Sequence, residues 1–326
     1  MTVNDKQLFS SHCDLVKFTH INRALSTKMS CDKSKALTRK DFIRLVSGVN
    51  SIEYLYQEYQ KIKNIKTEGT FRACITAANF EDERYGERLC FDHNCVILSK
   101  EKGVTNFINA SYINGFQQSK AYVATVTPYS EATIYKFWRM VWEHQSEIIV
   151  MLNAPINYEE GIYYWNPNEG DTFHCEKFRI ETVKVQMIFQ EIQLTKLCVT
   201  HENGDELFVN HFLFNWQDKY ISTPEYEFLQ LVKMVRLYNK FAVKQDDHTK
   251  SPIVIHCSDG TGRTMAFCAI DTEISRFLIT RRVDLYSTLS ELKKNRFDSF
   301  DSLDDVNYLS FIHLVLCCYF KTYPLE

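Results

Sequence analysis

Apolar residues recur at steps of three and four positions in two stretches of the chain, and this spacing is typical of amphipathic helices. The first stretch runs from Phe42 through Val49 to Tyr59, and the second occupies residues 131–145. One face of each helix would then be apolar and packed against the rest of the protein. The first stretch predicts a helical segment near the N-terminus, and the second predicts a helix that precedes a buried strand.

Shorter runs rich in β-branched and aromatic residues, separated by polar turns, predict strands. They occupy residues 96–98, 107–113, 121–125, 148–152, 178–189, 206–214 and 253–255. Pro224 favours the first turn of a helix, and helical spacing dominates the chain after residue 263. This alternation of strands and helices predicts an α/β (α+β) fold with a mixed sheet.

No internal repeat, low-complexity tract or Pro/Ser-rich linker divides the 326 residues. A single α/β unit of about 280 residues is within the size that one domain reaches. We therefore predict an N-terminal helical extension at residues 1–45 and one catalytic domain at residues 46–323. A split into two domains has little support from the sequence.

The 38 basic and 41 acidic side chains give a net charge of −3, which excludes a globally basic nucleic-acid binder. Hydrophobic residues make up 45% of the chain, enough for a sizeable core. The most apolar stretch, residues 311–320, is interrupted by His313 and is shorter than the roughly 18 residues that a membrane span needs. We expect a folded protein without nucleic-acid or membrane partners, and the oligomeric state stays open.

The 11 cysteines are odd in number and form no C-x-x-C pair, which argues against a disulfide framework. The first ten residues lack the basic and apolar runs of a secretory leader, and Thr2 stands where myristoylation requires glycine. These features indicate a reducing compartment and predict a cytoplasmic location.

The sequence IVIHCSDGTGRT at residues 253–264 joins an apolar strand to the start of a helix through a glycine-containing loop. The backbone amides of such a loop and the positive end of the helix can together hold a dianionic phosphate. We call this expected phosphate site the cradle. Its residues are the five that follow the cysteine: Ser258, Asp259, Gly260, Thr261 and Gly262.

Arg263 lies six residues after Cys257, so both side chains can face the cradle, where the guanidinium would clamp two phosphate oxygens. The same positive field would lower the pKa of Cys257 and make its thiolate the nucleophile. This arrangement predicts hydrolysis of a phosphate ester through a phosphocysteine intermediate, without a metal or other cofactor. The alternative is a buried structural cysteine beside a helix-capping loop.

The segment HCSDGTGRT at residues 256–264 closely resembles the signature of the cysteine-dependent, tyrosine-specific protein phosphatases. Residues 83–98, 107–116 and 121–152 resemble further segments of that family in the same order. The single-domain forms carried by the bracoviruses of parasitoid wasps are the most similar in character. The resemblance implies a twisted, strongly bent mixed sheet flanked by helices, and phosphotyrosine-containing proteins as partners.

Cleavage of a phosphate ester needs a general acid that protonates the leaving oxygen. The family carries this acid after a tryptophan on a mobile loop, and the resemblance assigns it to Asp218, with Gln217 in place of the usual proline. Thr264 resembles the hydroxyl that stabilises the departing thiolate, and His256 resembles the residue whose ring tunes the cysteine. The alternatives are a solvated loop aspartate at Asp218 and plain loop packing at Thr264 and His256.

The resemblance also assigns two substrate contacts outside the loop. Tyr85 would form one wall of a deep slot and stack on the substrate ring, and this depth favours phosphotyrosine over the shorter phosphoserine. Glu87 falls at the position of an acidic residue that holds the peptide backbone of the substrate. A core tyrosine and an exposed glutamate are the alternatives for these two positions.

Four further positions depart from the family pattern. Asp259 stands where active members have a small residue, and a carboxylate about 5 Å from the phosphate would cost on the order of 3 kcal/mol per unit of phosphate charge. This cost corresponds to about a hundredfold loss of rate, and the charge would also raise the pKa of Cys257. Asp304 replaces a glutamine that positions the hydrolytic water, and Thr127 follows Val126 where the family has a Gln-Gly pair.

Three functions follow from these observations. The joint retention of Cys257, Arg263 and Asp218 favours a working tyrosine phosphatase that interferes with host-cell signalling. Asp259 favours a pseudophosphatase that binds and sequesters phosphotyrosine proteins. A sulfur transferase or a dual-specificity phosphatase would use a similar loop, but the matching segments outside the loop argue against this third function.

Overall fold

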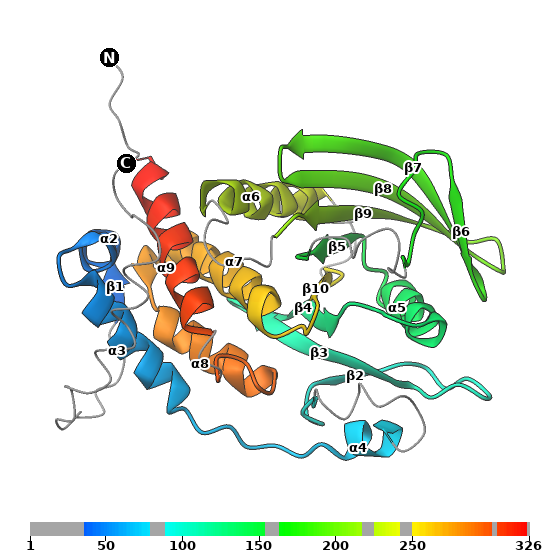
Figure 1. The fold of residues 1–326 in the computed structure, drawn as a ribbon, viewed down its shortest axis with the longest axis horizontal. Coiled ribbons are helices and arrows are strands. Elements are labelled where there is room, and N and C mark those ends of the chain that lie inside the picture. The colour runs from blue at the N-terminus through cyan, green and yellow to red at the C-terminus, as the bar shows by residue number, and fades with distance from the viewer. Residues whose placement is uncertain are drawn as a thin grey trace.

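A nine-stranded mixed sheet forms the centre of the molecule in a computed structural model, which describes residues 36–78, 89–153, 163–216, 225–241, 250–301 and 305–324 (Figure 1). The strands of this sheet are β2 (Cys95–Ile97), β3 (Phe107–Gly115), β4 (Gln118–Val126), β5 (Ile148–Met151), β6 (Thr172–Cys175), β7 (Phe178–Phe189), β8 (Ile192–His201), β9 (Glu206–Phe214) and β10 (Ile253–Cys257). A second, two-stranded sheet pairs β1 (Leu37–Thr38) with β11 (Arg282–Val283).

The strands of the large sheet follow the order β2-β3-β4-β10-β5-β9-β8-β7-β6. The central strands β4, β10, β5 and β9 run parallel, whereas the strands on either side pair antiparallel. β10 is buried along its whole length between β4 and β5. Ligands of open α/β sheets bind outside the carboxyl ends of the strands, so the loop after Cys257 lies where a ligand is expected.

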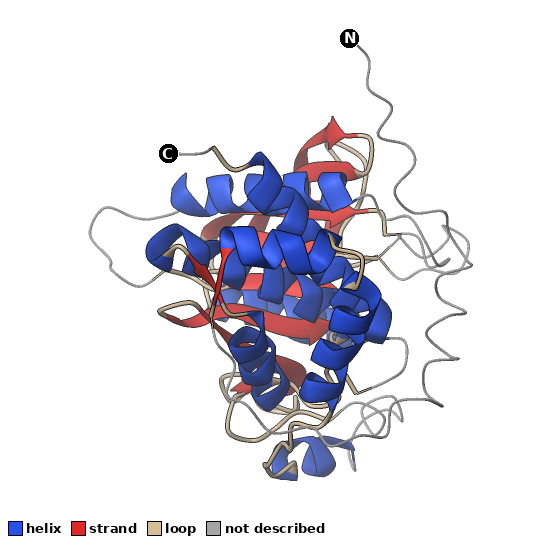
Figure 2. Ribbon diagram, turned by 90° about the vertical axis from the view of Figure 1, so that its left-hand side faces the viewer, coloured by secondary structure: helices blue, strands red, loops and turns tan. Residues whose placement is uncertain are grey.

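Helices cover both faces of this sheet (Figures 1 and 2). The helices packed on one face are α2 (Arg39–Ser47), α3 (Ser51–Lys63), α6 (Glu225–Phe241), α7 (Gly262–Thr280), α8 (Leu285–Asn295) and α9 (Asp305–Thr322). The opposite face packs against α5 (Glu131–Glu143). Because successive side chains of a strand point to opposite faces, Ile253 and Ile255 join the first core and Val254 joins the second.

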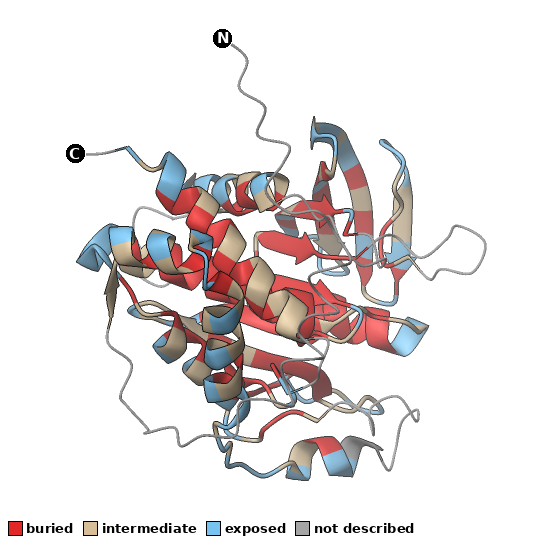
Figure 3. Ribbon diagram, turned by 60° about the vertical axis from the view of Figure 1, so that its left-hand side comes forward, coloured by how far each residue is buried: buried red, intermediate tan, exposed pale blue. Residues whose placement is uncertain are grey.

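Burial is concentrated in the central strands and in α7 (Figure 3). The first turn of α7 is buried together with most of the rest of the helix. The cradle therefore connects two rigid, buried elements, and such support holds functional groups in a fixed geometry.

The predicted α/β fold with a mixed sheet and flanking helices is confirmed. The strands predicted at residues 178–189 and 206–214 have those bounds, and the other predicted strands differ by a few residues at their ends. The prediction of one continuous helix through Val49 is wrong. The first helix stops at Gly48, whose backbone is extended, and Val49 is fully exposed before α3 begins.

The boundary that we predict between residues 45 and 46 falls inside α2. This helix packs on α9, where the rings of Phe42 and Phe320 meet edge to face and Arg39 donates a hydrogen bond to the Phe320 carbonyl oxygen. The division into an extension and a domain stays a prediction. Within the described ranges, no helix is both long and apolar enough to cross a membrane.

Candidate active site

The cradle loop turns sharply at Gly260, between the end of β10 and the start of α7. Gly260 has a φ angle of +69°, which side chains other than glycine rarely adopt. A methyl group on its α-carbon would lie 2.5 Å from the Thr125 carbonyl oxygen. Both the backbone angle and the lack of space explain why glycine stands here.

The Cys257 sulfur is buried at the carboxyl end of β10 and is surrounded by polar groups of the loop. It accepts hydrogen bonds from the Gly260 amide at 3.3 Å and from the Thr264 hydroxyl at 3.1 Å. Burial and the charge of Asp259 raise the pKa of Cys257 to about 11. Our expectation that the loop lowers this pKa is therefore wrong, because desolvation and the neighbouring carboxylate outweigh the Thr264 hydrogen bond.

The Asp259 carboxyl group is folded into the cradle. Its Oδ1 atom accepts hydrogen bonds from the amides of Thr261 at 2.9 Å and Gly262 at 3.4 Å, and from the Cys257 thiol at 3.2 Å. Such converging amides form an anion site. The chain's own carboxylate thus takes the amides that we expected to hold phosphate, while Ser258 lies exposed beside it.

Arg263 lies in the first turn of α7 and is mostly buried. Its Nη1 donates to the Leu152 carbonyl oxygen at 3.3 Å, and its guanidinium carbon lies 5.6 Å from the centre of the Trp216 ring. A cation over an aromatic face is stabilised by the ring electrons. Arg263 is thus held in place by neighbours outside its own helix.

Tyr308 of α9 shows that the key groups of the site converge. Its hydroxyl is hydrogen-bonded to Arg263 and close enough to Cys257 and Asp259 to sense their charges, while burial raises the pKa of this hydroxyl. Its ring lies against the cradle, since a methyl group on Gly262 would come within 2.4 Å of it. Tyr308 was not predicted from the sequence, because an aromatic residue in a helical stretch is typical of a core.

A buried hydrogen-bond network lies behind the cysteine. His256 contacts the Thr127 hydroxyl with Nδ1 at 2.9 Å and the Tyr164 hydroxyl with Nε2 at 2.7 Å. Tyr164 also contacts His211 Nε2 at 2.6 Å. Burial lowers the pKa of His256 and lowers that of His211 to about 3, so both rings are neutral. The Thr127 amide also donates to the Cys257 carbonyl oxygen at 2.9 Å, which links this network to the loop.

Neither Tyr164 nor His211 was predicted from the sequence. The signal that could have found His211 is a histidine inside the apolar strand β9, since a buried imidazole needs a hydrogen-bond partner. Thr127, whose effect the sequence left undefined, supplies one such partner to His256.

Four predicted site residues lie outside the described residues: Tyr85, Glu87, Asp218 and Asp304. Their roles stay predictions. Trp216, two positions before Asp218, is described and buried, and it packs against Phe228 and Phe311. The structure thus fixes the start of the segment that carries the predicted general acid.

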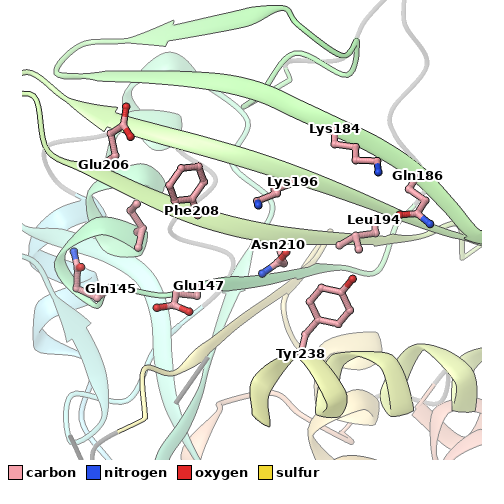
Figure 4. Close-up of a pocket in the computed structure, with 11 residues that line it drawn as sticks. Gln145, Glu147, Lys184, Gln186, Leu194, Lys196, Glu206, Phe208, Asn210 and Tyr238 are labelled. Atoms are coloured by element: carbon pink, nitrogen blue, oxygen red, sulfur yellow. The ribbon is translucent and has the colours of Figure 1, made fainter. Parts of the chain in front are cut away.

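A separate cavity of about 670 Å³ lies over β8 and β9 (Figure 4). Residues of both charges line it, including Glu147, Lys184, Lys196 and Glu206, and Tyr238 of α6 closes one side. None of its lining residues belongs to the cradle. Across the described ranges, no cluster of three or more histidine, cysteine or carboxylate side chains could hold a metal ion.

Comparisons with known proteins agree with this geometry. A sequence model of the family described as protein-tyrosine phosphatase matches residues 79–317. Tyrosine phosphatase H2 of Microplitis demolitor bracovirus is 33% identical over 278 residues, which cover 82% of this chain and 85% of that protein. Tyrosine phosphatase-like protein J1 of the same virus is 28% identical over 298 residues, 89% of this chain and 95% of that protein.

One cellular relative is a much longer protein. The rat tyrosine-protein phosphatase non-receptor type 9 is 29% identical over 268 residues, 77% of this chain but only 44% of that protein. The family match spans most of the chain, and it includes both the strand that ends in Cys257 and the helix that carries Arg263. This chain therefore belongs to the protein-tyrosine phosphatase family.

Proposed function

We propose that this protein hydrolyses phosphotyrosine in other proteins through a phosphocysteine intermediate. The observation that carries the proposal is the position of the Cys257 sulfur at the end of β10, in contact with the Gly260 amide and the Thr264 hydroxyl. Arg263 lies in the helical turn that follows and shares Tyr308 as a neighbour with Cys257. A nucleophile, a cation and inward-pointing amides are what phosphoryl transfer to a cysteine requires.

In the first step the phosphate of the substrate replaces the Asp259 carboxylate on the cradle amides, and Cys257 loses its proton to solvent. The sulfur attacks phosphorus, the bond to the tyrosine oxygen breaks, and Asp218 protonates that oxygen. Arg263 and the amides neutralise the charge on the phosphoryl oxygens. Tyr85 and Glu87 hold the tyrosine ring and the peptide backbone of the substrate.

In the second step a water molecule, positioned by Asp304, attacks the phosphocysteine. Asp218, now a carboxylate, takes a proton from this water as the phosphorus–sulfur bond breaks. The departing thiolate is stabilised by the Thr264 hydroxyl and the Gly260 amide, which already contact the sulfur in the free protein. These steps use groups of the chain, the substrate and water.

A second candidate function is that of a pseudophosphatase that binds and sequesters phosphotyrosine proteins without turning them over. The observation that favours it is the Asp259 carboxyl group on the amides of Thr261 and Gly262. This group competes with phosphate for the cradle and keeps Cys257 in its thiol form at neutral pH. Both effects reduce catalysis more than they reduce contacts with the rest of a partner protein.

The similarity to bracovirus tyrosine phosphatases supports a viral role. In this proposal the protein acts in the cytoplasm of a host cell and interferes with tyrosine phosphorylation in immune signalling. Its partners are phosphotyrosine-containing host proteins rather than nucleic acids or membranes.

The test is hydrolysis of a small aryl phosphate by the native protein, Cys257→Ser and Asp259→Ala. We expect activity in the native protein, none in Cys257→Ser, and about a hundredfold gain in kcat/KM in Asp259→Ala, the value of removing one such charge. A silent native protein that Asp259→Ala revives would favour the pseudophosphatase. Equal activity of the native protein and Cys257→Ser would refute the nucleophile.

A further inference from the structure

Three cysteines outside the active site lie together beneath the edge of the sheet. Cys74 of α4 (Arg72–Ala78), Cys90 and Cys95 form a small cluster with Phe107, separate from the two main cores. Cys74 and Cys90 are fully buried, whereas 8% of Cys95 is exposed. Both α4 and the edge strand β2, which pairs only with β3, lie at the periphery of the molecule (Figure 1). Peripheral clusters of this kind open more readily than a main core does.

Cys90 is the member of this cluster that contacts a cation, and in its thiol form it donates to Asn109 Oδ1 at 3.0 Å. The guanidinium of Arg296 donates from Nη1 to the Cys90 sulfur at 2.8 Å, and Arg296 is itself 1% exposed. Burial disfavours the anion, but the neighbouring Cys95 thiol and the charge of Arg296 together lower the pKa of Cys90. A thiolate is the form of cysteine that reacts with peroxides.

Cys95 supplies a second sulfur in the same buried cluster. Its interaction with Cys90 and its burial raise the pKa of Cys95. The pair thus consists of one nucleophilic sulfur and one protonated neighbour. Redox-sensitive cysteines have this arrangement, in which the neighbour resolves the oxidised sulfur.

Arg296 connects this pair to the cradle. A methyl group on Gly260 would lie 3.0 Å from Arg296 Nη2, so the guanidinium supports the back of the phosphate loop. The same Nη2 donates to Asn109 Oδ1 at 2.8 Å, and the Asn109 carbonyl oxygen accepts the Thr125 hydroxyl at 2.9 Å. One arginine is therefore shared between the Cys90 sulfur and the loop that carries the predicted nucleophile.

We propose that Cys90 and Cys95 form a peroxide-sensitive thiol pair, whose oxidation to a disulfide weakens the phosphate cradle through Arg296. The cysteine chemistry stands alone, whereas its effect on phosphate binding rests on the proposed function. The site is distinct from Cys257, whose raised pKa makes it the less reactive sulfur in the free protein.

The oxidant in this scheme is hydrogen peroxide. The Cys90 thiolate attacks one peroxide oxygen, the O–O bond breaks, and the hydroxide that leaves takes up a proton to form water. Cys90 is then a sulfenic acid. The Cys95 sulfur attacks the Cys90 sulfur, the S–O bond breaks, and a second water leaves with the Cys95 proton. Two thiols have lost two electrons and two protons, and one peroxide has become two waters.

The disulfide removes the negative charge that Arg296 contacts. A neutral disulfide sulfur is a weak acceptor, so a buried guanidinium is left without its charged partner, which is costly. Arg296 must then shift toward other acceptors, and Gly260 loses its support. The expected result is a looser loop with lower affinity for phosphate.

The chemical test uses full-length Cys257→Ser, so that the predicted nucleophile cannot contribute. Trypsin releases LCFDHNCVILSK, residues 89–100, which carries both cysteines of the pair, whereas Cys74 lies in the separate peptide ACITAANFEDER. After peroxide treatment we expect the first peptide to be two hydrogens lighter and resistant to alkylation, and dithiothreitol to reverse both changes. Cys74→Ser should behave like the parent, and Cys95→Ser should form no such bond.

The structural and functional tests follow oxidation of the same proteins. We expect faster hydrogen exchange in the amides of residues 258–264, and affinity for a phosphotyrosyl peptide about tenfold lower, the scale of one lost charged hydrogen bond. Cys95→Ser should show neither change. Hydrogen exchange needs no ligand, so it decides the proposal even if the parent binds no phosphopeptide, a result that would count against the proposed function alone.

Three results would overturn the proposal. The first is alkylation of both cysteines of residues 89–100 after oxidation. The second is a bond from Cys90 to Cys74 instead of Cys95. The third is a Cys90–Cys95 disulfide that leaves the exchange of residues 258–264 unchanged, because Arg296 would then not transmit its formation to the cradle.

Discussion

Cys257 and Asp259 form a hydrogen-bonded pair inside the cradle. The thiol donates to the carboxylate, and the carboxylate accepts the amides of Thr261 and Gly262. A phosphate can bind there only if it replaces this internal anion. Asp259 thus occupies the amides that we expected to hold phosphate, and its charge raises the pKa of the predicted nucleophile.

The pH dependence of Cys257 alkylation tests this arrangement. A cysteine reacts as the thiolate, which forms above its pKa, so we expect the rate with iodoacetamide to rise with pH toward about 11. Asp259→Asn removes the charge at nearly the same volume and should move the midpoint to lower pH. Site-resolved mass spectrometry gives the rate, and identical midpoints in the two proteins would contradict the role of Asp259.

Gly260→Ala should disrupt the cradle more than its backbone angle alone explains. A left-handed alanine costs about 1–2 kcal/mol, and here its methyl group would also meet the Thr125 carbonyl oxygen at 2.5 Å. Gly103→Ala is the matched control, because Gly103 has a φ of +82° and nothing within 4 Å of an added methyl group. Urea unfolding should show the larger loss for Gly260→Ala, and equal losses would argue against the close contact.

Among the secondary-structure elements, the end of β10 is connected to three other segments by a hydrogen-bond network that begins at His256. His256 contacts Thr127, which follows β4, and Tyr164, which lies before β6. Tyr164 in turn contacts His211 of β9. This network holds the carboxyl end of β10, and therefore Cys257, in place from the face opposite α7.

Tyr164→Phe should destabilise the protein by about 1–3 kcal/mol for each buried ring nitrogen that loses its partner. The affected atoms are Nε2 of His211 and Nε2 of His256. Tyr226→Phe, which removes a hydroxyl from an exposed side chain, is the control and should change little. Urea denaturation measures both, and a native-like Tyr164→Phe would mean that the network contributes no stability.

At the scale of the whole molecule, the sheet separates two cores, and both contain buried neutral histidines at their borders. Burial lowers the pKa of His211, His256 and His313. Each ring stays neutral in the folded chain, whereas the unfolded chain binds protons below about pH 6.5. Their contribution to stability is therefore present above pH 6.5 and is lost as the pH falls.

We expect protonation of His211 in the unfolded chain to lower the free energy of unfolding by about 1.4 kcal/mol at pH 5.5 relative to neutral pH. His211→Gln should remove one such proton and reduce the slope of stability against pH by up to about 1.4 kcal/mol per unit between pH 6.5 and 4.5. Urea unfolding across this range gives the slope. A slope unchanged by His211→Gln would show that this ring does not resist protonation.

Local patterns in the chain were enough to predict most of the helices and strands and the residues of the loop. Periodicity places a helix or strand because the spacing of apolar residues along the chain decides which face can be buried. The cradle could be predicted for a similar reason, since Cys257, the glycines and Arg263 lie within seven consecutive residues. The turn at Gly48 escaped prediction, because Val49 continues the apolar spacing although it is exposed.

The groups that surround and support the site come from distant parts of the chain and depend on packing. Tyr308 reaches the cradle from α9, Arg296 joins Cys90 across 206 positions, and Tyr164 joins His256 across 92. Contacts between such distant positions depend on how the helices pack on the sheet, and no local pattern encodes them. The raised pKa of Cys257 has the same origin, because burial is a property of the packed molecule.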